Sequence, residues 1–91
     1  MIVDDELFAR EGMVHDINWN SLDFTVCAVA KDGLQALEKY QETLPDLIIS
    51  DINMPHCNGI EMLQRLRDQG SDVQIIFLTA YSEFDYARDA L

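Results

Sequence analysis

The chain has 91 residues, of which 48% are hydrophobic and 25% charged, a composition typical of one small globular domain rather than of a disordered segment. Its formal net charge of -11, from 17 acidic residues against 6 lysines and arginines, argues against this chain binding nucleic acid or an anionic membrane by itself. No apolar run approaches the roughly 20 residues of a membrane span and the start lacks a signal-peptide pattern, so we expect a cytoplasmic protein whose DNA contacts lie outside this chain.

The first half of the chain alternates between strand and helix patterns. Ile2 and Val3 form an apolar run that is too short for a complete strand and leads directly into acidic residues. Residues 7–17 carry apolar side chains three and four positions apart, which predicts a helix. Residues 24–30 are rich in valine, threonine and phenylalanine and are expected to form a strand. An Asp-Gly turn then leads into a second helix over residues 34–42. The apolar face of this helix is expected to contain Leu34, Leu37 and Tyr40.

The second half centres on a short apolar strand that ends at an aspartate. Residues 47–49 follow a proline and predict a strand buried on both faces, with Asp51 at its carboxyl end. A third helix is expected over residues 60–67. The apolar stripe of this helix is expected to contain Ile60, Leu63 and Leu66. Residues 73–78 predict another buried strand, which delivers Thr79 at its carboxyl end. A last helix is expected to start a few residues after this threonine.

This alternating order predicts an α/β fold, a doubly wound parallel sheet with right-handed crossovers. The carboxyl ends of parallel strands open onto one edge of the sheet. Asp4 and Asp5 follow the first strand, and Asp51 follows the third. Thr79 follows the fourth, so all of these side chains are expected at the same edge. Close carboxylates repel unless they are protonated or bind a cation, and hard oxygen ligands suit Mg²⁺. The pattern predicts a metal and phosphate site, whereas the competing interpretation is that Asp51 only caps a turn.

Three stretches of the chain resemble the receiver domain of two-component response regulators, which has a flavodoxin-like fold. They are residues 2–6 (IVDDE), residues 46–55 (DLIISDINMP) together with Gly59, and residues 78–80 (LTA). Each motif is weak alone, but the three motifs at this spacing are specific. The likeness extends over the whole chain.

The resemblance implies a set of roles for individual residues. Asp51 would accept a phosphoryl group from a sensor histidine kinase. Mg²⁺ would be held by Asp5, with Asp4 assisting, by Asp51 and by the backbone carbonyl of Asn53. The Thr79 hydroxyl would bind the phosphoryl group. On this basis the chain is a phosphoacceptor rather than an enzyme, with at most slow self-dephosphorylation.

The resemblance also concerns the parts of the family pattern that flank or follow these motifs. Trp19 and residues 81–87 are similar to receivers joined to an AraC-like helix-turn-helix output, so a DNA-binding domain is expected outside this chain. The family pattern continues with a fifth strand, which bears a Lys-Pro pair, and a fifth helix, and neither lies in this sequence. We therefore expect residues 1–91 to form a receiver domain that is incomplete at its C-terminus and open to extension at its N-terminus. The edge of residues 73–78 would then be exposed, which favours a homodimer or an exchanged oligomer.

Other interpretations of the same residues stay open. A degenerate receiver that only dimerises would differ from a switch in failing to bind Mg²⁺. The Asp51 to Asn53 spacing is also found in aspartate-nucleophile phosphohydrolases, although such an enzyme would carry Asp-x-Asp after its first strand. The adjacent His56 and Cys57 suggest a redox or metal pair, but without further ligands they indicate an ordinary loop. Both cysteines, Cys27 and Cys57, are expected to be reduced thiols.

Overall fold

A parallel sheet with strand order β2-β1-β3-β4 forms the centre of the molecule in the computed structural model, which describes residues 1–78. Its strands are β1 (Ile2–Val3), β2 (Val29–Ala30), β3 (Leu47–Ser50) and β4 (Gln74–Phe77). Val3 pairs with Ala30 on one side and with Ser50 on the other, and Ser50 pairs with Phe77. This register brings the carboxyl ends of all four strands to the same edge of the sheet.

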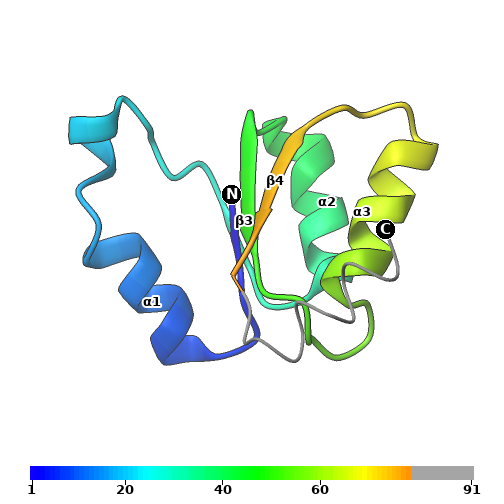
Figure 1. Ribbon diagram of the computed structural model, residues 1–91, viewed down its shortest axis with the longest axis horizontal. Coiled ribbons are helices and arrows are strands. Elements are labelled where there is room, and N and C mark those ends of the chain that lie inside the picture. Colours follow the sequence, from blue (N-terminus) through cyan, green and yellow to red (C-terminus); the bar gives the residue numbers. More distant parts are fainter. Residues whose placement is uncertain (79–91) are drawn as a thin grey trace.

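Helices cover both faces of this sheet, as the doubly wound prediction requires. They are α1 (Leu7–His15), α2 (Gly33–Thr43), α3 (Gly59–Asp68) and the short 3-10 helix η1 (Trp19–Leu22). Figure 1 shows α1 on one side of the sheet and α2 with α3 on the other. Within the described part of the chain, no helix is long and apolar enough to cross a membrane.

The main core lies between the sheet and the layer formed by α2 and α3. Its largest fully buried side chains include Val3 and Ile48 from the sheet and Met62 and Leu66 from α3. Met62 and Leu66 stand four positions apart, so they lie on the same face of the helix. A second, smaller cluster consists of Ile52, Ile60 and the partly buried Phe77. This second cluster lies at the carboxyl end of β3, where Ser50 pairs with Phe77.

The predicted strand over residues 24–30 is shortened to Val29–Ala30 in the structure. Ala28 still accepts a hydrogen bond from the Ile2 N–H of β1 at 3.1 Å, whereas Phe24 contacts η1 instead of the sheet. The Phe24 N–H donates to the Trp19 carbonyl at 3.0 Å, and the two rings meet edge to face with their centroids 6.3 Å apart. Asp23, the C-cap of η1, takes a left-handed conformation that turns the chain at this point. Strand propensity was therefore overridden by a local aromatic contact. The predicted first helix is also shorter, since α1 ends at His15.

Some residues that the sequence predicted to be buried are exposed in the structure. The run over residues 73–78 was expected to be a buried strand, but Ile76 and Leu78 are each 49% exposed. Among the described residues β4 is one of the two edge strands, and α1 packs against β1, so α1 does not cover β4. In α2 the predicted Leu37 and Tyr40 are partly buried and pack against the core beside the buried Ala36, whereas Leu34 is 43% exposed.

The predicted ends of the two remaining helices are close to those observed. The second helix runs over Gly33–Thr43 and the third over Gly59–Asp68. In the third helix Ile60 and Leu66 are buried as predicted, whereas Leu63 is only partly buried and the neighbouring Met62 is fully buried. The fourth predicted helix lies outside the described residues.

Candidate functional site

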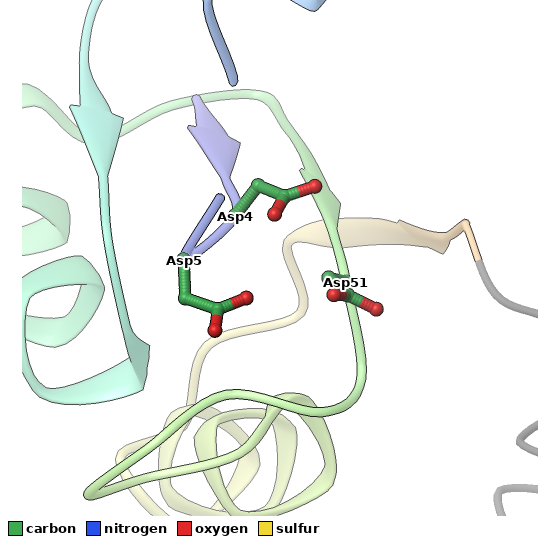
Figure 2. A group of neighbouring side chains, drawn as sticks. All are labelled: Asp4, Asp5 and Asp51. Atoms are coloured by element: carbon green, nitrogen blue, oxygen red, sulfur yellow. The ribbon is translucent and has the colours of Figure 1, made fainter. Parts of the chain in front are cut away.

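Three carboxylates meet at the carboxyl edge of the sheet. Asp4 and Asp5 follow β1, and Asp51 follows β3 (Figure 2). One ligand oxygen from each of them lies within 4.8 Å of the others. Asp4 and Asp51 are half-buried and Asp5 is exposed. The structure therefore brings together the acidic residues that the sequence placed at the ends of separate strands.

Backbone pairing explains why the two half-buried acids face the same space. The Asp4 N–H donates to the Ala30 carbonyl at 3.0 Å, and the Asp51 N–H donates to the Val3 carbonyl at 2.9 Å. Both bonds extend the parallel ladder by one residue beyond the strands. Asp4 and Asp51 are thus the first residues past two neighbouring strand ends, where the side chains are no longer covered by the sheet.

Local N–H groups orient two of the carboxylates. The Glu6 N–H donates to Asp4 Oδ1 at 2.9 Å, and the Ile52 N–H donates to Asp51 Oδ1 at 2.7 Å. Such bonds limit the rotation of a carboxylate. Three charged groups this close are mutually repulsive, and a small divalent cation that prefers oxygen ligands relieves the repulsion. The donor set of three carboxylates fits Mg²⁺, which binds through a few carboxylates and completes its shell with water.

The loop after Asp51 is fixed against the backbone that carries this aspartate. The Gly59 N–H donates to the Ile52 carbonyl at 2.8 Å, and the Ser50 hydroxyl donates to the Asp51 carbonyl at 2.7 Å. A Cβ at position 59 would come within 2.6 Å of the Asp51 carbonyl oxygen and 2.7 Å of the Phe77 ring. Glycine is required because the start of α3 approaches the Asp51 backbone this closely.

Helix α3 starts from this loop with a capping box that the sequence analysis missed. The Asn58 side chain accepts from the Glu61 N–H at 2.9 Å, and the Glu61 side chain accepts from the Asn58 N–H. The signal was present in the sequence as an asparagine followed three residues later by a glutamate. The box fixes where α3 begins, and with it the length of the loop that follows Asp51.

Two of the proposed site residues are not tested by this geometry. Asn53 is exposed and lies two residues after Asp51 in the same loop, and the role of its carbonyl as a metal ligand stays a prediction. Thr79 lies outside the described residues, so its contact with a phosphoryl group also stays a prediction.

His56 and Cys57 face different surroundings. His56 is exposed and has a left-handed backbone with a φ of 68°, whereas Cys57 is 1% exposed. The Cys57 carbonyl accepts from the Gly33 N–H at 2.9 Å, which ties the loop to the start of α2. Within residues 1–78, neither His56 nor Cys57 belongs to the group of side chains placed to hold a metal ion. The ordinary-loop interpretation of this pair fits its geometry, and both cysteines are free thiols.

Cys57 is expected to react much more slowly with iodoacetamide than Cys27 in the folded protein at pH 7.5. Burial raises the pKa of the Cys57 thiol, an effect that the nearby Arg65 only partly opposes, whereas Cys27 is exposed. The thiolate is the reactive form, so higher pKa and poor access should together slow Cys57 roughly tenfold or more. Peptide mass spectrometry over a time course measures both rates. In denaturant the two rates should converge, and equal rates in the native protein would contradict the buried position of Cys57.

Arg10 also contacts the site, although no motif in the sequence marks it as a site residue. Arg10 is half-buried on α1, and its Nη1 donates to the Asp4 backbone carbonyl at 2.8 Å. Nothing in the spacing of this arginine distinguishes it from a solvated surface residue. Only the way α1 packs beside β1 brings it to the acidic cluster.

Comparison with known proteins agrees with this fold and cluster. The family model described as the response regulator receiver domain matches residues 1–91. An uncharacterised response regulatory protein of Staphylococcus epidermidis is 40% identical over 88 residues, which cover 97% of this chain and 34% of the relative. The chain therefore spans about a third of the length of the curated relatives it matches.

Solved structures show the same similarity. A two-component transcriptional regulator AraC from Clostridium phytofermentans has a TM-score of 0.89 and 33% identity, covering 99% of this chain and 70% of that one. The CheX-CheY-BeF3-Mg complex from Borrelia burgdorferi has a TM-score of 0.81 and 27% identity, covering 98% of this chain and 66% of that one. The family match over the full sequence, the parallel sheet and the acidic cluster agree with one another, and the chain belongs to the response regulator receiver domain family.

Proposed function

We propose that this chain is a phosphoacceptor switch in which Asp51 accepts a phosphoryl group from a sensor histidine kinase. The observation that carries the proposal is the convergence of Asp4, Asp5 and Asp51, with ligand oxygens within 4.8 Å of one another. Membership of the receiver family supports the signalling role. The similar CheX-CheY-BeF3-Mg complex supports Mg²⁺ as the cation.

The chemistry assigned to Asp51 is a displacement at phosphorus. A carboxylate oxygen of Asp51 forms a bond to phosphorus, while the bond from phosphorus to the imidazole nitrogen of the kinase histidine breaks. The nitrogen keeps the electron pair. The Ile52 N–H, which donates to Asp51 Oδ1, holds the carboxylate plane during the approach. Asp4, Asp5, Asp51 and the Asn53 carbonyl would hold Mg²⁺, which when bound offsets the repulsion between two anions and orients the transferred group.

Thr79 is assigned a role after the transfer. Its hydroxyl, which the sequence places two residues after Phe77, would hydrogen-bond the phosphoryl oxygens and draw the loop that follows toward Asp51. A local change of charge then becomes a movement of the segment after β4. In this proposal the domain is a phosphoacceptor and not an enzyme, with at most slow self-dephosphorylation.

The remaining parts of the proposal concern partners and place. We assign the protein to the cytoplasm and its DNA contacts to an output domain outside this chain, in keeping with the similar transcriptional regulator and the net charge of -11. A homodimer or exchanged oligomer would cover the exposed Ile76 on β4 and Leu78 directly after it. The same two side chains favour the second candidate, a degenerate receiver that only dimerises, and the test is whether Mg²⁺ binds.

The full-length protein is expected to take up one phosphoryl group from acetyl phosphate in millimolar Mg²⁺, and none in excess chelator. Nucleophile and donor are both anionic, so the transfer needs a cation at the site. Intact mass spectrometry measures the uptake, and peptide mapping after borohydride reduction of the acyl phosphate locates it. A control with the chelator neutralised by added Mg²⁺ should recover the uptake. Uptake that persists in chelator, or that maps to another residue, would reject the proposal.

A further inference from the structure

Arg10 makes a contact with the acidic cluster that the proposed phosphoacceptor role does not yet use. It lies in the second turn of α1, and its Nη1 donates to the Asp4 carbonyl at 2.8 Å. Asp4 is thereby held at three points. Its N–H donates to the Ala30 carbonyl at 3.0 Å, and its Oδ1 accepts from the Glu6 N–H at 2.9 Å. The arginine holds the third point, the carbonyl.

The Asp4 carbonyl matters because it belongs to the same rigid peptide plane as the Asp5 N–H. A bond that fixes this carbonyl fixes the direction in which the chain leaves Asp4 and therefore where the Asp5 side chain begins. Asp5 is exposed, and within residues 1–78 its carboxylate accepts no hydrogen bond. Its position beside Asp4 and Asp51 depends on the backbone that carries it.

We propose that Arg10 is a positioning residue for the cation site, and that it holds the Asp4–Asp5 peptide so that the Asp5 carboxylate faces Asp4 and Asp51. The inference rests on the proposed function, since it assumes that these carboxylates bind Mg²⁺. The bond has a charged donor and is half-buried, and such bonds are stronger than those between neutral groups. An arginine suits the role because its guanidinium stays charged at every working pH.

A purely electrostatic view of Arg10 predicts the opposite result. A guanidinium bound to the backbone of the acidic cluster repels an incoming divalent cation, so its removal should tighten Mg²⁺ binding. Loss of positioning should weaken Mg²⁺ binding, because Asp5 would sample directions that do not face the other ligands. The sign of the change in affinity therefore separates the two effects.

The chain offers a matched control in Arg67. This arginine lies in the last turn of α3 and donates from Nη1 to the Ser71 carbonyl at 3.1 Å and from Nη2 to the Val73 carbonyl at 2.9 Å. Like Arg10 it joins a helix to backbone carbonyls of a connecting segment. Its bonds hold the segment that leads into β4. This segment lies at the amino ends of the strands, whereas Asp51 lies at their carboxyl ends. Removing either arginine changes the net charge equally.

The test compares Arg10→Met, Arg10→Lys and Arg67→Met in the full-length protein. Methionine keeps much of the apolar part of the side chain and removes the hydrogen-bond donors. Lysine keeps the positive charge and an ammonium donor that can reach the Asp4 carbonyl. Isothermal titration calorimetry with Mg²⁺ should give a Kd roughly three- to tenfold higher for Arg10→Met, from partial loss of one charged hydrogen bond. Arg10→Lys should fall between this variant and wild type. Arg67→Met should keep the wild-type Kd even though its thermal midpoint falls.

A second readout distinguishes positioning from general damage. In Arg10→Met the rate of phosphoryl uptake from acetyl phosphate should need more Mg²⁺ to reach half its maximum, while the maximum stays within about twofold of wild type. A folded Arg10→Met variant with unchanged or tighter Mg²⁺ binding would overturn the inference and leave the phosphoacceptor proposal standing. Wild-type protein that binds no Mg²⁺ would overturn both. If Arg10→Met does not fold, Arg10→Gln takes its place, because its side chain is too short to keep the bond to the Asp4 carbonyl. A folded Arg10→Gln variant with wild-type Kd and wild-type Mg²⁺ dependence would then overturn the inference.

Discussion

Phosphoryl uptake from acetyl phosphate is expected to vanish in the Asp51→Asn variant of the full-length protein. The amide has the shape of the carboxylate but no nucleophilic oxygen anion, so the loss should be complete, at least about a hundredfold in rate. Asparagine can still accept the Ile52 N–H bond that Asp51 Oδ1 accepts at 2.7 Å, so folding should be retained. Intact mass spectrometry after a fixed time with donor and Mg²⁺ measures the uptake.

Two further variants complete this experiment. Asp46→Asn changes an exposed acid at the opposite end of β3 and should take up phosphoryl like wild type. Thr79→Ala should still be phosphorylated but should respond weakly in a dimerisation readout, because its hydroxyl is assigned to the step after transfer. If Asp51→Asn incorporates phosphate as fast as wild type, another residue is the acceptor and the assignment of Asp51 is wrong.

Millimolar Mg²⁺ is expected to raise the thermal midpoint of the wild-type protein, and the Asp5→Asn variant should lose most of this increase. A ligand bound only by the native state adds about 2.7 kcal/mol at a hundredfold excess over its Kd. For a domain of this size that corresponds to roughly 10–20 °C in thermal midpoint. Differential scanning calorimetry with Mg²⁺ and with chelator gives the two midpoints for each protein.

The thermal midpoint of Asp5→Asn in the absence of metal provides a second check on the same site. Asp5 lies within 4.8 Å of two other carboxylates, so neutralising it removes repulsion when no cation is bound. In chelator, Asp5→Asn should therefore be as stable as wild type or slightly more stable. Asp68→Asn, which changes an exposed acid at the end of α3, should keep the full response to Mg²⁺. An unchanged midpoint in wild type, or a full response in Asp5→Asn, would contradict a cation site at these residues.

The order of the elements and the place of the acidic residues could be predicted from the sequence alone. Apolar runs and helical periodicity are local properties, so β3, α2 and α3 were found close to their observed bounds. Once the order was known, the rule that parallel strands end at one edge placed Asp4, Asp5 and Asp51 together without any coordinates. In the structure one ligand oxygen from each of these side chains lies within 4.8 Å of the others, which agrees with that rule.

Tertiary packing decided what local pattern could not. Phe24 has strand propensity, but its ring packs on Trp19, and the strand shrinks to Val29–Ala30. Ile76 reads as a core residue, but it is half-exposed because α1 packs against β1 rather than over β4. Exposure depends on which elements lie above a side chain, and that is set by distant parts of the chain.

The contact of Arg10 with the Asp4 carbonyl is another feature that tertiary packing decided. Sequence determined which side chains can carry the chemistry, because carboxylates after strand ends are a property of residue type and order. Only the tertiary structure decided which neighbours hold them, because the bond of Arg10 to the Asp4 carbonyl at 2.8 Å forms where α1 packs beside β1. A backbone carbonyl has no sequence signature, so an arginine that binds one is indistinguishable in sequence from an arginine in solvent.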